Sequence, residues 1–208
     1  MVRRRTPSSA RSRWGDDYRR KIRPCLDSHQ AYCRRHGYAY ARLESPPSHQ
    51  PRHPSWYKIP LVHGLMRRGH RRIFYIDADA LITNPDISLE PFFEPLSREN
   101  KTLHLAEDDG GVNMGVFFMT NTPDAIRLLD LLWTNDLGLH RPTWEQAALK
   151  DLLNHYVQVR KVVSLSPSAT AFNSFPRERA ELAHAGQEND WSRGDFICHF
   201  SGIRSPRA

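Results

Sequence analysis

Residues 71–85 read RRIFYIDADALITNP, a hydrophobic run that two aspartates, Asp77 and Asp79, interrupt before it resumes. In an extended backbone, side chains two positions apart point to the same side, so both carboxylates can converge on one cation. Two carboxylates between apolar runs need a compensating charge. Hard oxygen ligands of this kind suit Mg²⁺ or Mn²⁺, which also bind substrate phosphates. The stretch therefore predicts a strand that leads into a divalent-metal site. A solvated turn is the alternative for an Asp-x-Asp pair on its own.

The segments around this stretch alternate between helical and β-rich patterns, which predicts an α/β fold. Helices are expected at residues 16–35, 56–68, 124–133 and 145–154, and strands at 38–43, 72–76, 102–106, 116–120, 157–163 and 196–199. Open sheets of this class place their ligand crevice at the carboxyl ends of the strands, where Asp77 lies. We expect a mostly parallel twisted sheet flanked by helices. Residues 1–14 are expected to form a basic flexible tail, and residues 15–208 a single domain.

The composition is basic, with 30 lysines and arginines against 23 acidic residues and a pI near 9.6. This favours anionic partners such as phosphates, nucleic acid or lipid head groups, but part of the excess lies in the arginine-rich opening segment. The three cysteines include no Cys-x-x-Cys pair, so neither a disulfide framework nor a zinc site is expected. No apolar run approaches the roughly 18 residues that span a bilayer. These features favour a cytoplasmic location for the chain as given, or the Golgi lumen if an N-terminal anchor has been lost.

The segment FYIDADALITNP (74–85) resembles the Asp-x-Asp region of retaining GT-A glycosyltransferases, especially the galactosyl, xylosyl and mannosyl transferases of the GMA12/MNN10 type, family GT34. Further blocks resemble that family in the same order: SHQAYCRRHGYAY (28–40), WYKIPLVHGLM (56–66), NMGVFFMTNTP (113–123), WEQAALKDLL (144–153) and GDFICHFSGIR (194–204). The resemblance implies a GT-A type fold, a nucleotide-diphosphate sugar donor, a glycan or other hydroxyl acceptor, and Mn²⁺ or Mg²⁺ as the cofactor.

The resemblance also implies roles at the metal and the diphosphate. His199 would complete the metal site with the two aspartates; a hydrogen-bonded structural histidine is the alternative. Gly202 and Arg204 would bind the diphosphate, because glycine lets the backbone approach and a guanidinium donates two parallel hydrogen bonds. Lys58 would face the nucleotide or diphosphate, which Asp77 would also contact. The alternatives are a basic C-terminal tail for Arg204 and a surface lysine for Lys58.

Further residues are expected at the sugars. Asn113 offers an amide donor and a carbonyl acceptor to sugar hydroxyls, and Gly115 would leave room beside the ring. Asp108 would contact acceptor hydroxyls, although turn chemistry at residues 110–113 and a solvated acidic loop are the competing explanations.

Glu145 and Gln146 are the candidate catalytic residues, because retaining transfer needs a group on the sugar face opposite the leaving diphosphate. Many family members have Asp-Gln at this place, so Glu145 shifts the carboxylate by one methylene. The alternative is a helix-terminus charge that stabilises the dipole.

The family normally opens with a hydrophobic strand, and the first dozen residues, MVRRRTPSSARS, do not resemble one. Whether another segment completes the sheet is open. The expected function is metal-dependent, retaining transfer of a hexose or pentose. One alternative is a degenerate GT-A domain that binds nucleotide or glycan without turnover. Another is a metal-dependent nucleic-acid-binding protein, which explains the pI but not Asn113, Glu145 or Gln146; we expect no nucleic-acid partner.

Overall fold

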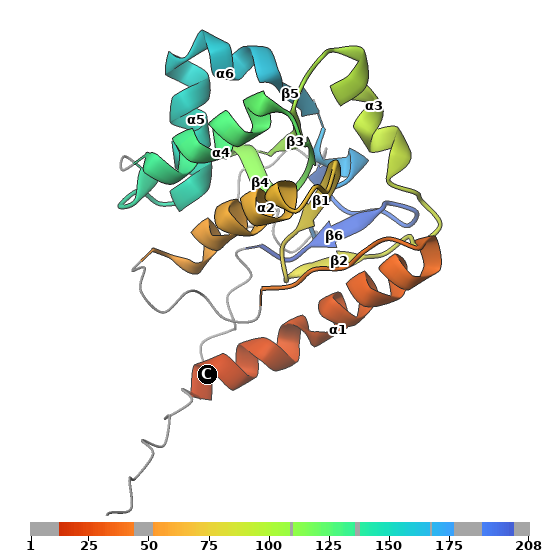
Figure 1. The fold of residues 1–208 in the computed structure, drawn as a ribbon. Coiled ribbons are helices and arrows are strands. Elements are labelled where there is room, and N and C mark those ends of the chain that lie inside the picture. Colours follow the sequence, from red (N-terminus) through yellow and green to blue (C-terminus); the bar gives the residue numbers. More distant parts are fainter. Residues whose placement is uncertain are drawn as a thin grey trace, which may run out of the picture.

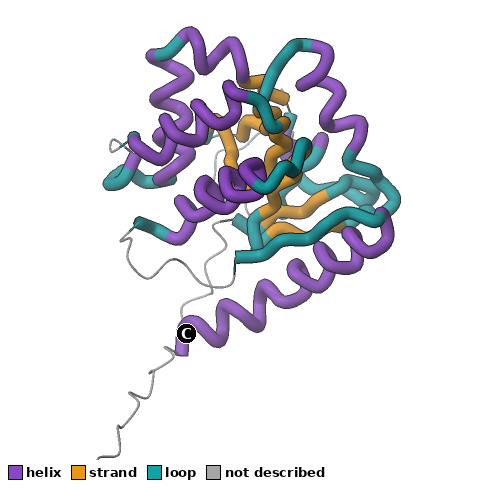
Figure 2. Tube along the Cα trace, viewed as in Figure 1, coloured by secondary structure: helices purple, strands orange, loops and turns teal. Residues whose placement is uncertain are grey.

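The computed structural model describes residues 13–43, 52–108, 110–135, 138–166, 168–176 and 189–201. Helices cover both faces of a central sheet, and a long N-terminal helix lies beneath a second, smaller sheet (Figure 1). Tracing the chain by secondary structure shows the strands enclosed by helices and loops (Figure 2). The predicted mixed α/β fold is confirmed.

The helices are α1 (Arg13–His36), α2 (Lys58–Arg67), α3 (Glu90–Arg98), α4 (Pro123–Thr134), α5 (Trp144–His155) and α6 (Val157–Val162), with 3-10 turns η1 (Pro54–Tyr57) and η3 (Ala169–Ala171). The strands are β1 (Arg72–Ile76), β2 (Ala80–Ile82), β3 (Leu103–Asp108), β4 (Gly111–Thr120), β5 (Val163–Ser166) and β6 (Ile197–His199). Four predicted helices are confirmed. Pro24 does not end α1, and Gly37 and Gly69 have φ of 72° and 89°, the left-handed conformation typical after a helix.

The expectation of a mostly parallel sheet is wrong. The larger sheet has the order β1-β4-β3-β5, and only β3 and β5 run parallel. The reason lies in the connection between β3 and β4. Only two residues separate Asp108 from Gly111, and strands joined so closely can pair only as an antiparallel hairpin. The ten-residue β4 is also the antiparallel partner of β1, so β4 makes the larger sheet mostly antiparallel.

Two predicted strands are also wrong. Residues 157–162 form helix α6, and the strand begins only at Val163, because Val159 and Val162 pack on the same core at a helical spacing of three. Residues 38–43 join no ladder, and β1 pairs with β4 alone among the described residues.

The hydrogen-bond pattern between β1 and β4 shows which backbone groups of β1 face away from β4. Asn121 N–H donates to Arg71 O and Asp77 N–H donates to Gly115 O, so alternate residues from 71 to 77 bond to β4. The backbone groups of Arg72, Phe74 and Ile76 therefore face outward, and they have no backbone partner within the described part of the chain.

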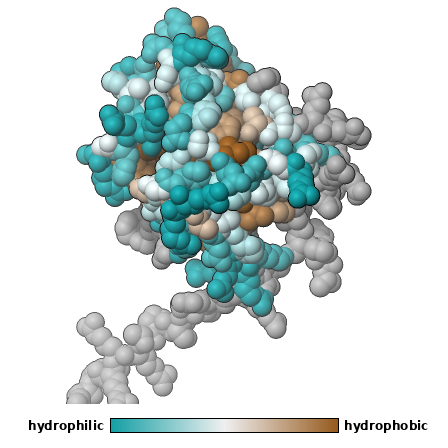
Figure 3. All heavy atoms as spheres, turned by 90° about the vertical axis from the view of Figure 1, so that its right-hand side faces the viewer, coloured by the Kyte–Doolittle hydropathy of each residue, from teal (hydrophilic) through white to brown (hydrophobic). Residues whose placement is uncertain are grey.

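The two faces of the larger sheet bury separate cores. Ile73 and Tyr75 of β1 pack with α2, α4, α5 and α6, whereas Phe74 and Ile76 pack with α3, β2, β6 and Tyr32 of α1. This two-residue alternation is what a strand buried on both sides requires. The face of the molecule on the α3 side is mostly hydrophilic, with small apolar patches between polar side chains (Figure 3). No helix among the described residues is long and apolar enough to cross a membrane.

Candidate active site

The acidic pair lies directly after β1, and the small sheet brings a histidine to it. β2 and β6 pair antiparallel with Ala80 opposite His199, which places the histidine one residue from Asp79. The Phe200 N–H donates to Asp79 O at 2.9 Å and fixes this register. One ligand atom from each of Asp77, Asp79 and His199 lies within 4.8 Å of the others. The predicted convergence of these three residues is confirmed.

The ring of His199 suits a cation between itself and Asp79. His199 is 2% exposed, its Nδ1 lies 2.8 Å from Asn173 Oδ1, and its Nε2 lies 3.4 Å from Asp79 Oδ1. Nε2 has no hydrogen-bond partner among the described residues. An imidazole whose Nδ1–H donates to Asn173 presents a lone pair at Nε2, and a lone pair facing a carboxylate needs a cation or a proton between them. Two carboxylates and one imidazole therefore fit a divalent metal ion.

The negative charge at this site affects a side chain of helix α1. Burial alone would raise the pKa of Asp79, but the adjacent His199, a backbone hydrogen bond and the charge of Lys58 together lower it. Burial and the Asp79 charge together raise the pKa of the Cys25 thiol to about 11, which keeps it protonated at neutral pH. Cys25 lies in the middle of α1, the helix that packs against β2, where His29 Nε2 lies 2.6 Å from Ala80 O next to Asp79.

The position of the His199 ring requires a glycine at residue 115. A Cβ built on Gly115 would fall on Cε1 of the His199 ring, far inside van der Waals contact. The sequence had suggested room beside a sugar ring at this position; the neighbour that occupies the space is the imidazole. Any larger residue would displace His199 from Asp79.

Lys58 is a buried ion-pair partner. Its Nζ lies 3.3 Å from Asp77 Oδ2 and 2.9 Å from Glu145 Oε1, and it donates to Met114 O at 2.8 Å. Burial alone would lower the pKa of this ammonium, but Asp77 and Glu145 outweigh burial and raise it. Lys58 thus connects the metal-site carboxylate to the candidate catalytic carboxylate.

Tyr75 orients Asp77 from the strand itself. Its hydroxyl donates to Asp77 Oδ1 at 2.7 Å, while Lys58 bonds the other oxygen. Burial, followed by the Asp77 charge, raises the pKa of Tyr75 well above its ordinary value. Tyr75 was not predicted as a site residue, although its two-residue spacing from Asp77 places both side chains on one side of the strand.

Glu145 and Gln146 occupy the first turn of α5. Gln146 Oε1 accepts from the Met114 N–H at 2.8 Å, which ties the helix to β4. Glu145 is 3% exposed, and its Oε2 is buried without a hydrogen-bond partner among the described residues. The preceding Thr143 and Trp144 have φ of 72° and 40°. Non-glycine residues held in this left-handed region store backbone strain of a kind that clusters at functional sites.

The remaining expected residues fall into two groups. Asn113 is 2% exposed, its Nδ2 donates to Asp108 Oδ2 at 2.8 Å, and its Oδ1 accepts from the Gly115 N–H. Asn113 thus bonds both Asp108 and Gly115, the glycine that packs against the His199 ring. Gly202 and Arg204 lie outside the described residues.

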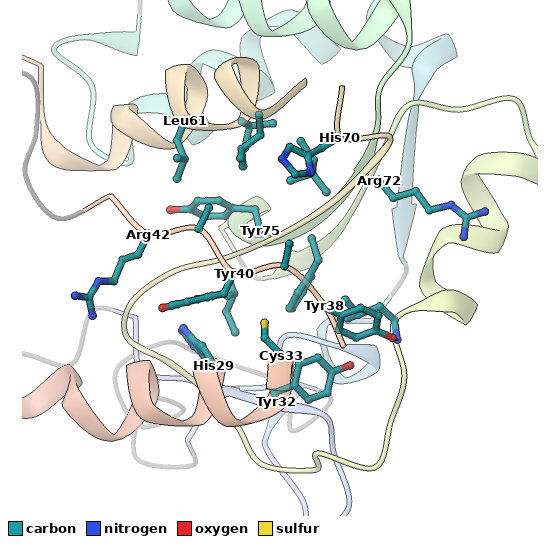
Figure 4. Close-up of a pocket in the computed structure, with 18 of the residues that line it drawn as sticks. His29, Tyr32, Cys33, Tyr38, Tyr40, Arg42, Leu61, His70, Arg72 and Tyr75 are labelled. Atoms are coloured by element: carbon teal, nitrogen blue, oxygen red, sulfur yellow. The ribbon is translucent and has the colours of Figure 1, made fainter. Parts of the chain in front are cut away.

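A groove of about 600 Å³ opens beside the site, between α1, residues 38–43, α2 and β1. Figure 4 shows Tyr75 and Leu61 on one side of it and Tyr40, His29 and Cys33 on the other. Its lining is mostly apolar and aromatic. The groove follows the outward edge of β1 and reaches the site through Tyr75.

The sequence pattern of the galactosyl transferase GMA12/MNN10 family matches residues 10–99 and 93–207 of this chain. The chain belongs to that family. The resemblance inferred from the Asp-x-Asp segment and its companion blocks is thereby confirmed, and with it the assignment of the chain to a family of glycosyltransferases.

Individual relatives agree with membership in the GMA12/MNN10 family. A probable alpha-1,2-galactosyltransferase of Schizosaccharomyces pombe, gmh2, is 25% identical over 71% of this chain and 51% of its own length. A probable alpha-1,6-mannosyltransferase of Saccharomyces cerevisiae, MNN10, is 25% identical over 88% of this chain and 55% of its own length. The chain spans about half the length of these curated relatives.

A solved structure supports the fold assignment. The crystal structure of a glycosyltransferase involved in the glycosylation of the major capsid of PBCV-1 superposes with a TM-score of 0.66 at 18% identity. The match covers 88% of this chain and 87% of the other. The fold of this GMA12/MNN10 family member therefore resembles that of a known glycosyltransferase.

Proposed function

We propose that this chain is a metal-dependent hexosyltransferase, which moves a galactosyl or mannosyl residue from a nucleotide-diphosphate sugar to a glycan or other hydroxyl acceptor. The observation that carries the proposal is the cluster of Asp77, Asp79 and His199, in which His199 Nε2 faces the Asp79 carboxylate and has no hydrogen-bond partner among the described residues. A pentose donor is the alternative within the same reaction class.

Asp77, Asp79 and His199 would hold Mn²⁺ or Mg²⁺, which when bound neutralises negative charge on a departing diphosphate. Tyr75 and Lys58 keep the Asp77 carboxylate in one orientation, since each bonds one of its oxygens. Asp77 therefore reaches the reaction with little reorganisation, which is the condition for strong electrostatic stabilisation.

Transfer with retention is proposed to depend on Glu145. Its carboxylate is paired with Lys58, and its second oxygen is buried without a hydrogen-bond partner among the described residues, so its negative charge is held in a dry environment. In such surroundings a carboxylate stabilises an oxocarbenium-like transition state or attacks the anomeric carbon. Gln146 holds the helix start against β4 through Met114. Asn113 is proposed near the donor sugar, Asp108 near the acceptor, and Gly202 and Arg204 at the diphosphate.

The direct test is a donor screen with UDP- and GDP-hexoses and UDP-xylose, with Mn²⁺, Mg²⁺ or EDTA, read as released nucleotide diphosphate. We expect metal-dependent release with one hexose donor, and product NMR should show the anomeric configuration of the donor retained. Asp79→Asn should abolish release. Asp86→Asn is the matched control, because Asp86 is an exposed aspartate that pairs with Arg35 instead. Release that is unaffected by EDTA, or by Asp79→Asn, would contradict the metal-dependent mechanism.

A domain that binds nucleotide or glycan without turnover is the second candidate. The outward edge of β1 and the open groove beside it favour this reading, because they lie next to Tyr75 and hence next to the metal site. Nucleotide-sugar binding in the presence of Mn²⁺, together with no release of diphosphate from any donor, would establish it.

A further inference from the structure

Asn173 lies at the one side of His199 that the metal site does not use. It is fully buried, and its Oδ1 is 2.8 Å from His199 Nδ1. The backbone fixes the two residues relative to each other. The His199 N–H donates to Ser174 O at 2.7 Å, Ser174 forms a parallel bridge with Cys198, and the Asn173 N–H donates to Ala169 O at 2.6 Å. Asn173 is therefore held beside the imidazole by main-chain contacts on both sides.

Phe175 and Gly115, which also contact the His199 ring, offer it no polar side-chain group, so they do not determine its tautomer. Phe175 stacks on the imidazole with ring centroids 5.7 Å apart, and Gly115 closes the Cε1 edge without offering a side chain. Asp79 lies on the Nε2 side. Within the described part of the chain, Asn173 is thus the polar side chain that bonds Nδ1, and what it offers there decides which ring nitrogen carries the proton.

We propose that Asn173 is a positioning residue for the metal site, which holds the proton of His199 on Nδ1 so that the Nε2 lone pair faces the ligand cluster. The inference rests on the metal-binding part of the proposed function. Outer hydrogen-bond partners of this kind fix the tautomer and the orientation of a metal-ligating histidine. No sequence motif pointed to this residue; only the register between the 173–175 segment and β6 brings it to His199.

An amide at this position can either accept from the imidazole or donate to it, which a carboxylate or an aliphatic side chain cannot. Asn173 Nδ2 is buried without a hydrogen-bond partner among the described residues. If the amide turned over, Nδ2 would donate to Nδ1, the ring proton would move to Nε2, and Nε2 would donate to Asp79. In one orientation the amide therefore stabilises a ring whose Nε2 lone pair can bind a metal ion. In the other it stabilises a ring whose Nε2–H donates to Asp79. A carboxylate accepts only from Nδ1–H, and an aliphatic side chain supports neither state.

Three variants separate this role from ordinary packing. Asn173→Leu keeps a side chain of similar size and removes the hydrogen bond, whereas Asn173→Asp keeps the acceptor. Asn121→Leu is the matched control, because Asn121 donates to Met66 O and His70 O on the other side of the fold. One readout is the His199 tautomer in metal-free protein by ¹⁵N NMR, assigned by comparison with His199→Gln. The other is the Mn²⁺ dissociation constant without donor, by electron paramagnetic resonance.

We expect the parent and Asn173→Asp to show Nδ1–H. Asn173→Leu should lose this preference and weaken Mn²⁺ binding by roughly 10- to 100-fold, the usual effect of removing such a partner. Asp in place of Asn should bind Mn²⁺ at least as tightly as the parent, and Asn121→Leu should leave both readouts unchanged. An unchanged tautomer and Mn²⁺ affinity in Asn173→Leu would overturn the proposal. If that variant does not fold, an Nε2–H tautomer in Asn173→Asp would overturn it instead.

The test also distinguishes this inference from the proposed function. A parent protein that binds no Mn²⁺ would remove the metal-dependent mechanism, yet the NMR readout in metal-free protein would still decide whether Asn173 sets the tautomer. A parent that binds Mn²⁺ with the proton on Nε2 would retain the function and reject the role of Asn173.

Discussion

Glu145 is a buried carboxylate with one cationic partner, Lys58, and one oxygen without a hydrogen bond in the described structure. A glutamate that only stabilised the start of α5 would need neither burial nor a buried lysine, because helix-terminus charges act from the surface. The arrangement favours a role in the chemistry, where a charge held in a dry site acts most strongly on a developing cation.

Glu145→Gln keeps the shape of the side chain and removes its charge. We expect donor affinity to survive and turnover to fall by about 10² to 10³, as when one electrostatic stabiliser is removed, or further if the carboxylate attacks the sugar. The measurement is diphosphate release per folded molecule. Asp151→Asn is the control, since Asp151 lies on the same helix and bonds Arg141. Lower thermal stability with unchanged turnover would return Glu145 to a purely structural role.

Lys58→Met leaves two carboxylates without their shared cation. Removing one member of a buried ion pair typically costs about 3–5 kcal/mol, and both Lys58 and Glu145 are nearly fully buried. We expect a loss of that order in the free energy of unfolding, measured by urea denaturation. The double variant Lys58→Met with Glu145→Gln should recover part of the lost free energy, because it no longer buries the unpaired charge of Glu145. Equal stability of the single and double variants would contradict the pairing.

Residues with strong local chemistry were predictable, and residues that act through a neighbour were not. Asp77 and Asp79 converge as their two-residue spacing after a strand indicated, and His199 joins them as the resemblance to the family implied. Asn173 is an ordinary polar residue in sequence, and its partner lies 26 positions away. The buried position of Lys58 was missed for a related reason, because its charge suggested exposure.

At the scale of elements, β4 carries the site. It supplies Gly115 to His199, Met114 to Lys58 and Gln146, and Asn113 to Asp108. The sequence predicted the second half of this strand but not its first half, because residues 111–115 resemble a turn in composition. Pairing with β3 across a two-residue connection extends the ladder through them. The antiparallel sheet was unpredictable for the same reason, since strand direction depends on partners that a linear pattern does not identify.

Gly115→Ala tests this role of β4. The added methyl group would fall on the His199 ring, so His199 must leave its position beside Asp79. We expect Mn²⁺ binding to be lost and the melting temperature to drop, read by paramagnetic resonance and calorimetry. Gly64→Ala in α2 is the matched control, because a Cβ there meets nothing within 4 Å. Replacing glycine by alanine inside a helix should stabilise by about 0.5–1 kcal/mol. Retained Mn²⁺ affinity in Gly115→Ala would mean that His199 is not a ligand.

At the scale of the whole molecule, the buried groups of the site make stability depend on alkaline pH. The pKa values of Lys58 and Tyr75 are both raised in the folded protein. Stability from such groups is fully present below their unfolded pKa values, about 10 for both, and is lost as pH rises further.

We therefore expect a level free energy of unfolding from pH 7 to about 9 and a decline above pH 10, measured by urea denaturation across the range. Tyr75→Phe should make the decline shallower, while Tyr156→Phe, at an exposed tyrosine, should not alter it. Identical pH profiles for the parent and Tyr75→Phe would place the alkaline sensitivity elsewhere.

The outward edge of β1 has a consequence for handling the protein. Among the described residues, the outward N–H and C=O groups of β1 have no backbone partner, and they lie along an apolar groove. Such an edge is a template on which another chain can add, and natural edges are usually guarded by proline, bulges or inward charges. Concentrated preparations should therefore self-associate through edge pairing, visible as a concentration-dependent sedimentation coefficient. Arg72→Pro removes an outward N–H at the first position of the strand, where proline is tolerated, and should keep the protein monodisperse. If Arg72→Pro leaves the concentration dependence of sedimentation unchanged, self-association occurs through a surface other than the edge of β1.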